Sequence, residues 1–180
     1  MKEYIKVPLE RIAAIIGTNG EVKKFIEEKT TASLNIDSQA GDIEIDIEDT
    51  VKGLRTKDVI NAIARGFSPE KAFRLFDDDL LMFETINISD IAKTEKDLHR
   101  IQGRMIGSTG STREIFENLT GALISVYGKT VSTIGYPNQN RVVREGIEMI
   151  LTGSAQKVVY KFLEKKALEL KNGRCQNIIE

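Results

Sequence analysis

The chain has 180 residues, with 26 Lys and Arg against 27 Asp and Glu and a formal net charge of -1. Its hydrophobic content of 41% is that of a globular protein and excludes a chain that is disordered throughout. The near-neutral charge argues against binding nucleic acid through a general basic coat, so any polyanion site must depend on local geometry.

Hydrophobic periodicity divides the first half of the chain into alternating and helical segments. In chain order these predict a strand over 3–7, a helix over 9–16, a helix from 21 to about 30, strands over 33–37 and 42–47, and a helix over 56–64. Ser68 followed by Pro69 is a typical helix start, with Ser as the N-cap, and it predicts a further helix through residue 76.

The second half shows the same succession of patterns. It predicts a strand over 85–88, helices over 101–106 and 112–119, strands over 123–127 and 129–134, and a helix over 139–151. A final helix over 155–171 is expected, with Ser154 as its N-cap and Gly173 as its stop. We expect the apolar face of this last helix to pack on the core.

An internal repeat explains why the two halves look alike. Residues 15–27 recur as residues 105–117, and the apolar and glycine positions match without a gap from 15 to 36 at the same offset of 90 residues. The repeat predicts two homologous modules, over 1–83 and 84–180. The segment around Ser68 and the last helix lie outside the repeat.

Each module carries a Gly-x-x-Gly loop between two predicted helices, at 17–20 and at 107–110. Glycine allows the sharp turn, and the second helix begins directly after it, so its free N–H groups face outward. Such a helix end binds phosphate without net positive charge nearby. One such loop is a weak signal, but two in the same context indicate a shared function.

The element order and the loop sequences Ile-Ile-Gly-Thr-Asn-Gly and Met-Ile-Gly-Ser-Thr-Gly resemble the KH domains of RNA-binding proteins. The resemblance implies an α+β fold with two type I KH domains, each a three-stranded antiparallel sheet packed on three helices, plus extra linker and C-terminal helices. It also implies that each loop clamps the backbone of single-stranded RNA. The loop role carries over to Gly17, Thr18, Asn19, Gly20, Gly107, Ser108, Thr109 and Gly110.

Neither loop holds the Lys or Arg that many KH loops carry between the glycines, so neighbouring cations are expected to assist. These candidates are Arg11, Lys23 and Lys24 in the first module and Arg104 and Arg113 in the second. The bases would lie in an apolar groove next to each loop. Its candidate floor consists of Ile12, Ile16, Ile36, Ile101, Ile106 and Val126, although packing in the core is the alternative for each.

A closer resemblance links residues 64–72 (Ala-Arg-Gly-Phe-Ser-Pro-Glu-Lys-Ala) and 159–166 (Val-Tyr-Lys-Phe-Leu-Glu-Lys-Lys) to one family. This is the tandem-KH family of small-subunit ribosome-assembly proteins that act with the Nob endonuclease, and an intact first loop is typical of its archaeal members. The resemblance implies binding near the 3′ end of small-subunit ribosomal RNA. It also implies contact with the Nob endonuclease and with a translation initiation factor.

Other chemistries find little support in the sequence. One cysteine, Cys175, and one histidine, His99, are too few for a Cys/His zinc site or a Cys–His nucleophile pair. We expect no catalytic residue, no metal and no cofactor; the acidic run 77–79 is expected to be solvated.

No signal peptide or apolar run of ~20 residues is found, which predicts a cytoplasmic protein without membrane contact. The alternatives are a protein-interaction scaffold and a general KH-type RNA regulator or decay factor.

The two modules are not expected to contribute equally. Glu21 directly follows the first loop, at the helix end where a phosphate would sit, and the acidic hairpin 42–49 adds negative charge to that module. The second loop is followed by a neutral residue, Ser111. We therefore expect the second module to dominate RNA affinity.

Overall fold

The computed structural model describes residues 2–176, apart from the side chains of residues 174–176. The chain forms two compact units, Met1–Asp79 and Leu80–Glu180, whereas the repeat placed the boundary between 83 and 84. Strand β4 (Met82–Asn87) lies across the expected boundary. Because Met82 pairs with Gly135 and Phe83 with Ile134, this strand belongs to the second sheet from its first residue.

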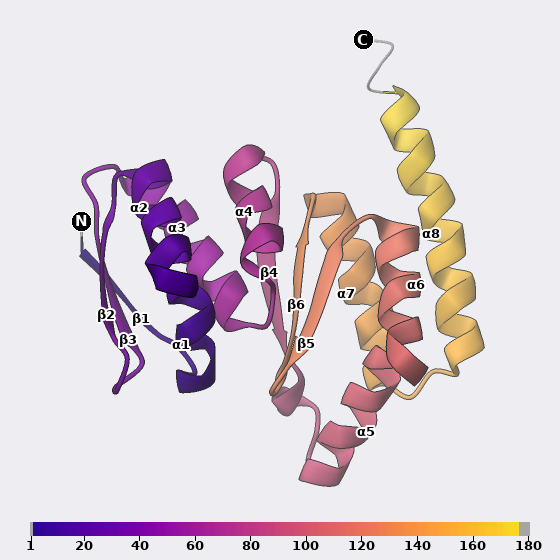
Figure 1. Cartoon of the computed structure of the whole chain (residues 1–180). Helices are drawn as coiled ribbons and strands as arrows, with labels where there is room; N and C mark the ends of the chain where they lie inside the picture. The colour runs from indigo at the N-terminus through magenta and orange to yellow at the C-terminus, as the bar shows by residue number, and fades with distance from the viewer. Residues whose placement is uncertain (1, 177–180) are drawn as a thin grey trace. The chain divides into compact units, whose positions relative to one another are not determined.

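The first unit contains one antiparallel sheet whose strands lie in the order β1-β3-β2 (Figure 1). Its elements are β1 (Lys2–Lys6), α1 (Leu9–Ile16), α2 (Glu21–Thr30), β2 (Ser33–Asp37), β3 (Asp42–Asp46), α3 (Thr50–Ala64) and α4 (Pro69–Asp77). A single 3-10 turn over Thr18–Gly20 joins α1 to α2. The helices α1–α3 cover one face of the sheet.

The second unit repeats this topology, with strand order β4-β6-β5. Its remaining elements are the 3-10 turn Ile88–Asp90, α5 (Glu95–Ile106), the 3-10 turn Ser108–Gly110, α6 (Ser111–Thr120), β5 (Leu123–Tyr127), β6 (Thr130–Gly135), α7 (Pro137–Leu151) and α8 (Gln156–Gln176). Helix α8 lies outside α6 and α7 (Figure 1). The predicted α+β class, with two three-stranded antiparallel sheets and additional helices α4 and α8, is confirmed.

Two helices begin a turn or more before the residues that the apolar pattern predicted. Asp49 caps α3, and its Oδ1 accepts hydrogen bonds from the backbone N of Val51 (2.9 Å) and Lys52 (3.1 Å). Thr94 caps α5 by accepting from the backbone N of Asp97 (3.1 Å). These first turns are polar, so hydrophobic periodicity detects only the packed part of each helix, and the cap decides the start.

The limits of the last helix also differ from the prediction. Ala155, not Ser154, occupies the cap position, because its carbonyl accepts from the backbone N of Val158 and Val159. The helix passes Gly173 and ends at Gln176. By contrast, Ser68 caps α4 as expected, with Pro69 at its first position.

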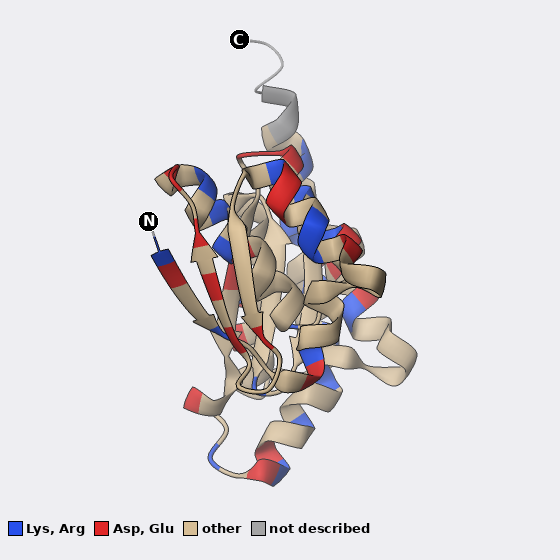
Figure 2. Cartoon of the chain, turned by 60° about the vertical axis from the view of Figure 1, so that its left-hand side comes forward, with Lys and Arg blue, Asp and Glu red and all other residues tan. Residues whose placement is uncertain are grey.

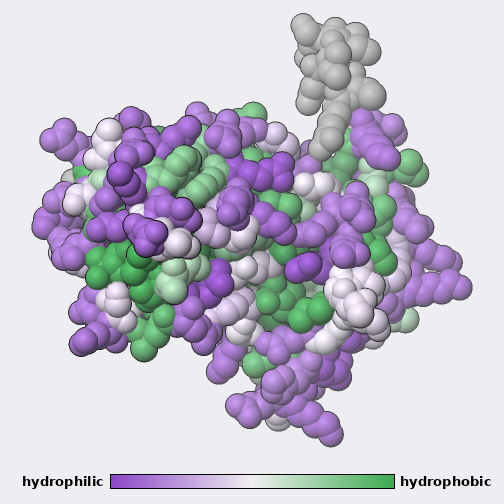
Figure 3. Space-filling model, in the orientation of Figure 1, coloured by the Kyte–Doolittle hydropathy of each residue, from purple (hydrophilic) through white to green (hydrophobic). Residues whose placement is uncertain are grey.

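A continuous apolar core lies between sheet and helices in each unit. Ile15, Ile26, Ile43 and Ile60 are fully buried in the first. In the second, α8 adds Val159 and Leu163 to the core built on β5, β6 and α5–α7, with Phe162 and Leu170 packed against it. Core packing of the last helix is therefore confirmed, although Val158, which its apolar spacing also places on that face, is exposed. Surface hydrophobic residues form separate patches between hydrophilic ones (Figure 3).

Candidate nucleic-acid interface

Both Gly-x-x-Gly loops adopt the same backbone conformation. Gly17 and Gly107 have φ angles of 76° and 74°, and Gly20 and Gly110 have φ angles of 77° and 84°. All four lie in the region that favours glycine. The loops thus form two equivalent sharp turns, each between the end of one helix and the start of the next.

The two glycines of a loop serve different purposes. A Cβ at Gly17 would lie 2.8 Å from the backbone N of Val22, and one at Gly107 would lie 2.7 Å from the backbone N of Thr112. A Cβ at Gly20 would have no neighbour within 4 Å, and one at Gly110 only Nη2 of Arg113 at 3.9 Å. The first glycine therefore permits close packing inside the protein, whereas the second leaves its outer face open to a ligand.

Helices α2 and α6 begin directly behind these open glycines. Among the described residues, no side chain caps either helix at Gly20 or Gly110. The backbone N–H groups of Glu21 and Ser111 donate to the carbonyls of Thr18 and Ser108 within the loops. The positive end of the helix dipole and the next N–H groups of the first turn face the loop without a side-chain cap. This arrangement suits one phosphate of an extended backbone at each loop.

The third loop residue carries backbone strain. Asn19 and Thr109 both have a φ angle of 53°, a left-handed conformation that Asn tolerates and that is unfavourable for β-branched Thr. The hydroxyl of Thr109 donates a hydrogen bond to the Ser108 carbonyl (2.7 Å). Because this bond is exposed to water, it compensates for little of the conformational strain at Thr109. The second loop is therefore the more strained of the two.

We expect Thr109→Asn to raise the free energy of unfolding by about 0.5–1 kcal/mol, because Asn occupies this conformation at lower cost. Chemical denaturation would measure it. Asn19→Thr is the matched reverse exchange and should lower stability by a similar amount. Equal stability of both variants and the native chain would show that these loops relax without strain.

The cations beside the loops differ between the units. Arg113, on α6, has a terminal nitrogen close to Gly110, and its Nε is buried without a hydrogen-bond partner among the described residues. Lys23, at the equivalent position on α2, forms an ion pair with Glu27 at 3.8 Å. Arg113 is thus better placed than Lys23 to meet a phosphate.

Arg104, a candidate for RNA contact, is engaged by hydrogen bonds within its own unit. Its guanidinium donates to the carbonyls of Ile150 and Ser154 and to Oε1 of Gln156. Arg11 acts similarly in the first unit, donating to the carbonyls of Ile63 (2.9 Å) and Phe67 (3.0 Å). Both arginines donate to carbonyl groups near the C-terminal end of the third helix of their unit. These partners are distant in the sequence, so the residue type and its position next to the loop could not predict the contacts.

The candidate groove residues fall into two groups. Ile16, Ile36 and Val126 are half-buried, and Ile106 is 39% exposed. Ile16 and Ile106 directly precede the loops, whereas Ile36 lies on β2 and Val126 lies on β5, packed in part against the core. Ile12 (4% exposed) and Ile101 (1% exposed) belong to the core, which is the alternative that the sequence left open for each candidate. Both sit on the buried face of their helix, which helical spacing alone does not distinguish from the groove side.

The helix behind each loop is tied to the strand that borders the groove. Oε1 of Glu27 accepts from the backbone N of Leu34 (2.8 Å), and Oε1 of Glu117 accepts from the backbone N of Ile124 (2.8 Å). The two bonds are equivalent in the repeat. These bonds were not predicted from the sequence. The signal that could have indicated them is that Glu27 and Glu117 occupy the same position in the two copies of the repeat.

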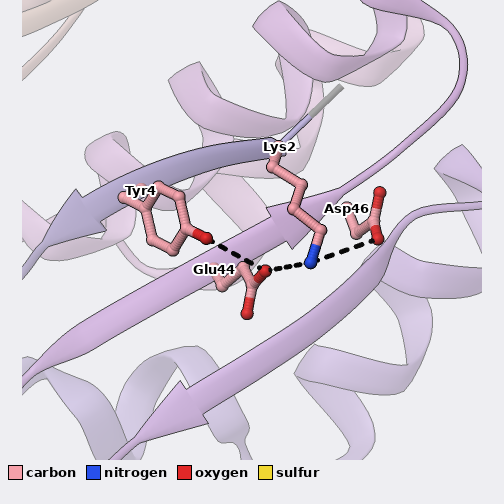
Figure 4. A network of polar contacts seen from close by, with 4 residues as sticks. All are labelled: Lys2, Tyr4, Glu44 and Asp46. Carbon is pink, nitrogen blue, oxygen red and sulfur yellow. Dashed lines mark hydrogen bonds and ion pairs between the residues drawn. The ribbon is translucent and has the colours of Figure 1, made fainter.

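The acidic hairpin of the first unit lies on the outer face of its sheet. Asp42, Glu44 and Asp46 pair across from Lys6, Tyr4 and Lys2 of β1. Lys2 donates to Oε1 of Glu44 (2.6 Å) and lies 3.9 Å from Asp46, while the Tyr4 hydroxyl donates to Glu44 (3.2 Å) (Figure 4). The hydrogen bond from Lys2 holds the pKa of Glu44 below its ordinary value.

This placement weakens one reason for expecting unequal modules. Asp42, Glu44 and Asp46 are on strand β3, on the face not covered by α1–α3, where acidic segments mark the strands in Figure 2. Lysines neutralise part of their charge, and Asp49 instead caps α3. Glu21 does begin α2 as expected, but α6 also has an acid in its first turn, Glu114. The asymmetry therefore rests on Glu21, Lys23 and Arg113 and not on the hairpin.

No cluster of metal ligands is found among the described residues. No three His, Cys, Asp or Glu side chains of that part of the chain come together to hold a metal ion. His99 is exposed on α5, and the side chain of Cys175 lies outside the described part. None of the helices in the described range is long and apolar enough to span a membrane.

Both halves of the chain match models of one domain family. Residues 2–65 match the model described as the KH domain, and residues 82–168 match that of the eukaryotic type KH domain, or KH-domain type I. Both matches contain a Gly-x-x-Gly loop.

The chain is similar over nearly all its length to archaeal proteins. It is 38% identical to KH domain-containing protein MJ0443 of Methanocaldococcus jannaschii, over 97% of this chain and 78% of the relative. A crystal structure of an a/eIF2alpha-aDim2p-rRNA complex from Pyrococcus horikoshii matches with a TM-score of 0.87 and 42% identity, covering 94% of this chain and 95% of that chain. Pre-rRNA-processing protein PNO1 of Coccidioides immitis is 29% identical over 79% of this chain, which spans 57% of the relative.

Proposed function

Because this chain belongs to the tandem type I KH-domain family that includes archaeal Dim2p and eukaryotic PNO1, we propose that it binds single-stranded RNA near the 3′ end of small-subunit ribosomal RNA. Its role would be in assembly of the small ribosomal subunit and maturation of that 3′ end. The observation that carries the proposal is the pair of uncapped helix starts behind the open glycines Gly20 and Gly110.

Binding would use the backbone and the bases of the RNA in different ways. The N–H groups at the start of α2 and α6 hold phosphates, and Arg113 and Lys23 add charge. Unstacked bases lie against Ile16 and Ile36 in the first unit and Ile106 and Val126 in the second. With aromatic residues at only 6% and no Trp, ring stacking has a small part in binding.

Two protein partners belong to the proposal. A translation initiation factor is supported by the similar Pyrococcus protein, whose structure contains a/eIF2alpha as well as rRNA. The proposed contact with the Nob endonuclease is supported by the family resemblance of residues 64–72 and 159–166. A role on the small subunit would place this protein in the cytoplasm.

Crosslinking in cells followed by sequencing of the bound RNA would test the target. We expect reads concentrated at the 3′ end of the small-subunit ribosomal RNA. Reads spread over messenger RNA would favour a general KH regulator or decay factor. A protein that binds no RNA, yet is recovered with assembly intermediates, would be a scaffold.

Affinity should depend only weakly on salt concentration. Few cations lie at the loops, and Lys and Arg alternate with acidic residues along the ribbon in Figure 2. Contacts to roughly 2–4 phosphates per module predict a slope of log affinity against log salt near -1.4 to -2.8 for each module engaged. A titration series between about 50 and 200 mM salt would measure it.

A much steeper slope would contradict the small number of phosphate contacts. The exposed lysines of α8, such as Lys161 and Lys165, would then be the first residues to replace.

A further inference from the structure

A polar cluster behind the second loop connects it to the C-terminal helix. We call Thr112, Gln156 and Tyr160 the Thr112 cluster. The hydroxyl groups of Thr112 and Tyr160 lie 3.0 Å apart, and Nε2 of Gln156 donates to Oγ1 of Thr112 (2.8 Å) and to the Tyr160 hydroxyl (3.1 Å). Thr112 is in the first turn of α6, directly after the loop, so α8 holds the helix end at which RNA is proposed to bind.

Gln156 contacts both sides of the loop. Besides Thr112, its Nε2 donates to the Arg104 carbonyl (3.4 Å), and its Oε1 accepts from the Arg104 guanidinium (3.4 Å). Arg104 is in the last turn of α5. A single side chain of α8 therefore bridges the helix before the loop and the helix after it.

In the first unit, the corresponding position in the first turn after the loop makes an apolar contact. The position equivalent to Thr112 is Val22, whose side chain packs directly on Gly17. Thr112 is 1% exposed, so water cannot replace the partners that α8 supplies, and a buried hydroxyl without a partner is costly. The second loop is consequently joined to α8 by polar contacts at Thr112, whereas in the first unit α2 meets its added helix α4 through the aromatic pair Phe25 and Phe73, with ring centroids 4.4 Å apart.

We propose that Gln156 and Tyr160 are positioning residues for RNA binding by the second loop, a proposal that rests on the function proposed above. They hold the first turn of α6 so that its N–H groups converge on one phosphate while Thr109 stays in its strained conformation. Without them the loop samples other conformations, and apparent affinity falls in proportion to the fraction of competent loops.

Tyr160→Phe removes one hydroxyl, and Gln156→Leu removes the bridge. Each is expected to weaken binding of an oligoribonucleotide carrying the 3′-terminal sequence of archaeal small-subunit ribosomal RNA by roughly three- to tenfold, the equivalent of one hydrogen bond. Val158→Ala is the matched control, because Val158 lies on the same helix with its side chain exposed, and it should leave affinity unchanged.

A second pair of variants separates positioning from general stability. In a Thr109→Asp background, which disables the second loop, Tyr160→Phe should cause no further loss of the residual affinity. An equal loss in that background would overturn the proposal, because the effect would then not pass through this loop.

Hydrogen exchange gives a readout that does not require RNA. Both variants should speed amide exchange over residues 108–112 and leave residues 18–22 unchanged. If the native chain fails to bind the oligonucleotide, the proposed function is wrong, but exchange still tests the positioning role. Unchanged exchange over 108–112 would refute that role even if RNA binding is strong.

Discussion

Replacing Thr109 by aspartate is expected to weaken RNA binding by roughly ten- to a hundredfold, the largest effect of any single loop substitution. The residue is exposed in the loop between Gly107 and Gly110, and a carboxylate there would stand at the start of α6, where a phosphate is proposed to bind. It would repel that phosphate and occupy N–H groups whose hydrogen bonds to a charged group are worth about 1.5–3 kcal/mol.

Asn19→Asp should weaken binding less than Thr109→Asp. Glu21 already lowers the affinity of the first helix end for anions, and Lys23 is paired with Glu27, whereas Arg113 lies beside Gly110. One titration with single-stranded RNA decides between the modules, and Thr109→Asn serves as the neutral control that copies the first loop. If both aspartate variants weaken binding equally, the modules share the RNA and the asymmetry is wrong.

Gly107→Ala should cost about 2–5 kcal/mol of folding stability in the second unit. The new Cβ would lie 2.7 Å from the backbone N of Thr112, at a φ angle of 74°. Overpacking against backbone costs about 1–3 kcal/mol, and the left-handed conformation about 1–2 kcal/mol more. Denaturant unfolding followed by circular dichroism would report the loss.

Two matched glycine substitutions sharpen this experiment. Gly110→Ala carries the conformational cost but no close contact, so it should lose only about 1–2 kcal/mol. Gly103→Ala lies within α5 with nothing near the added Cβ, and it should stabilise by up to ~1 kcal/mol. If Gly107→Ala and Gly110→Ala proved equally destabilising, the first glycine would have no special packing role.

Much of the site could be predicted because its signals are local in sequence. The glycines of both loops, their matching contexts and the helix starts behind them follow from one repeated pattern, and the structure gives both loops the same dihedral angles. Ile16 and Ile106, both accessible to solvent, are groove candidates because they directly precede the loops. Cap residues that set helix starts, such as Asp49 and Thr94, were also present in the sequence but were outweighed by apolar spacing.

Contacts between residues distant along the chain could not be predicted in this way. Arg104 looks like a phosphate ligand by its position, yet it meets carbonyl groups of residues 150 and 154. The acidic hairpin looks like a barrier to RNA, yet it pairs with lysines of β1 on the outer face of the sheet. In both cases the acceptor or partner is about forty or more residues away.

The sequence by itself determined the repeated topology, the two loops and the assignment to an RNA-binding family, because alternation, helical spacing and glycine requirements act over a few neighbouring residues. Only the tertiary structure decided which cations remain near the loops, which isoleucines are core, and that α8 supports the second loop through Gln156 and Tyr160. The physical reason is that burial of a side chain, and the partner that a buried polar group requires, depend on which distant segment packs against it.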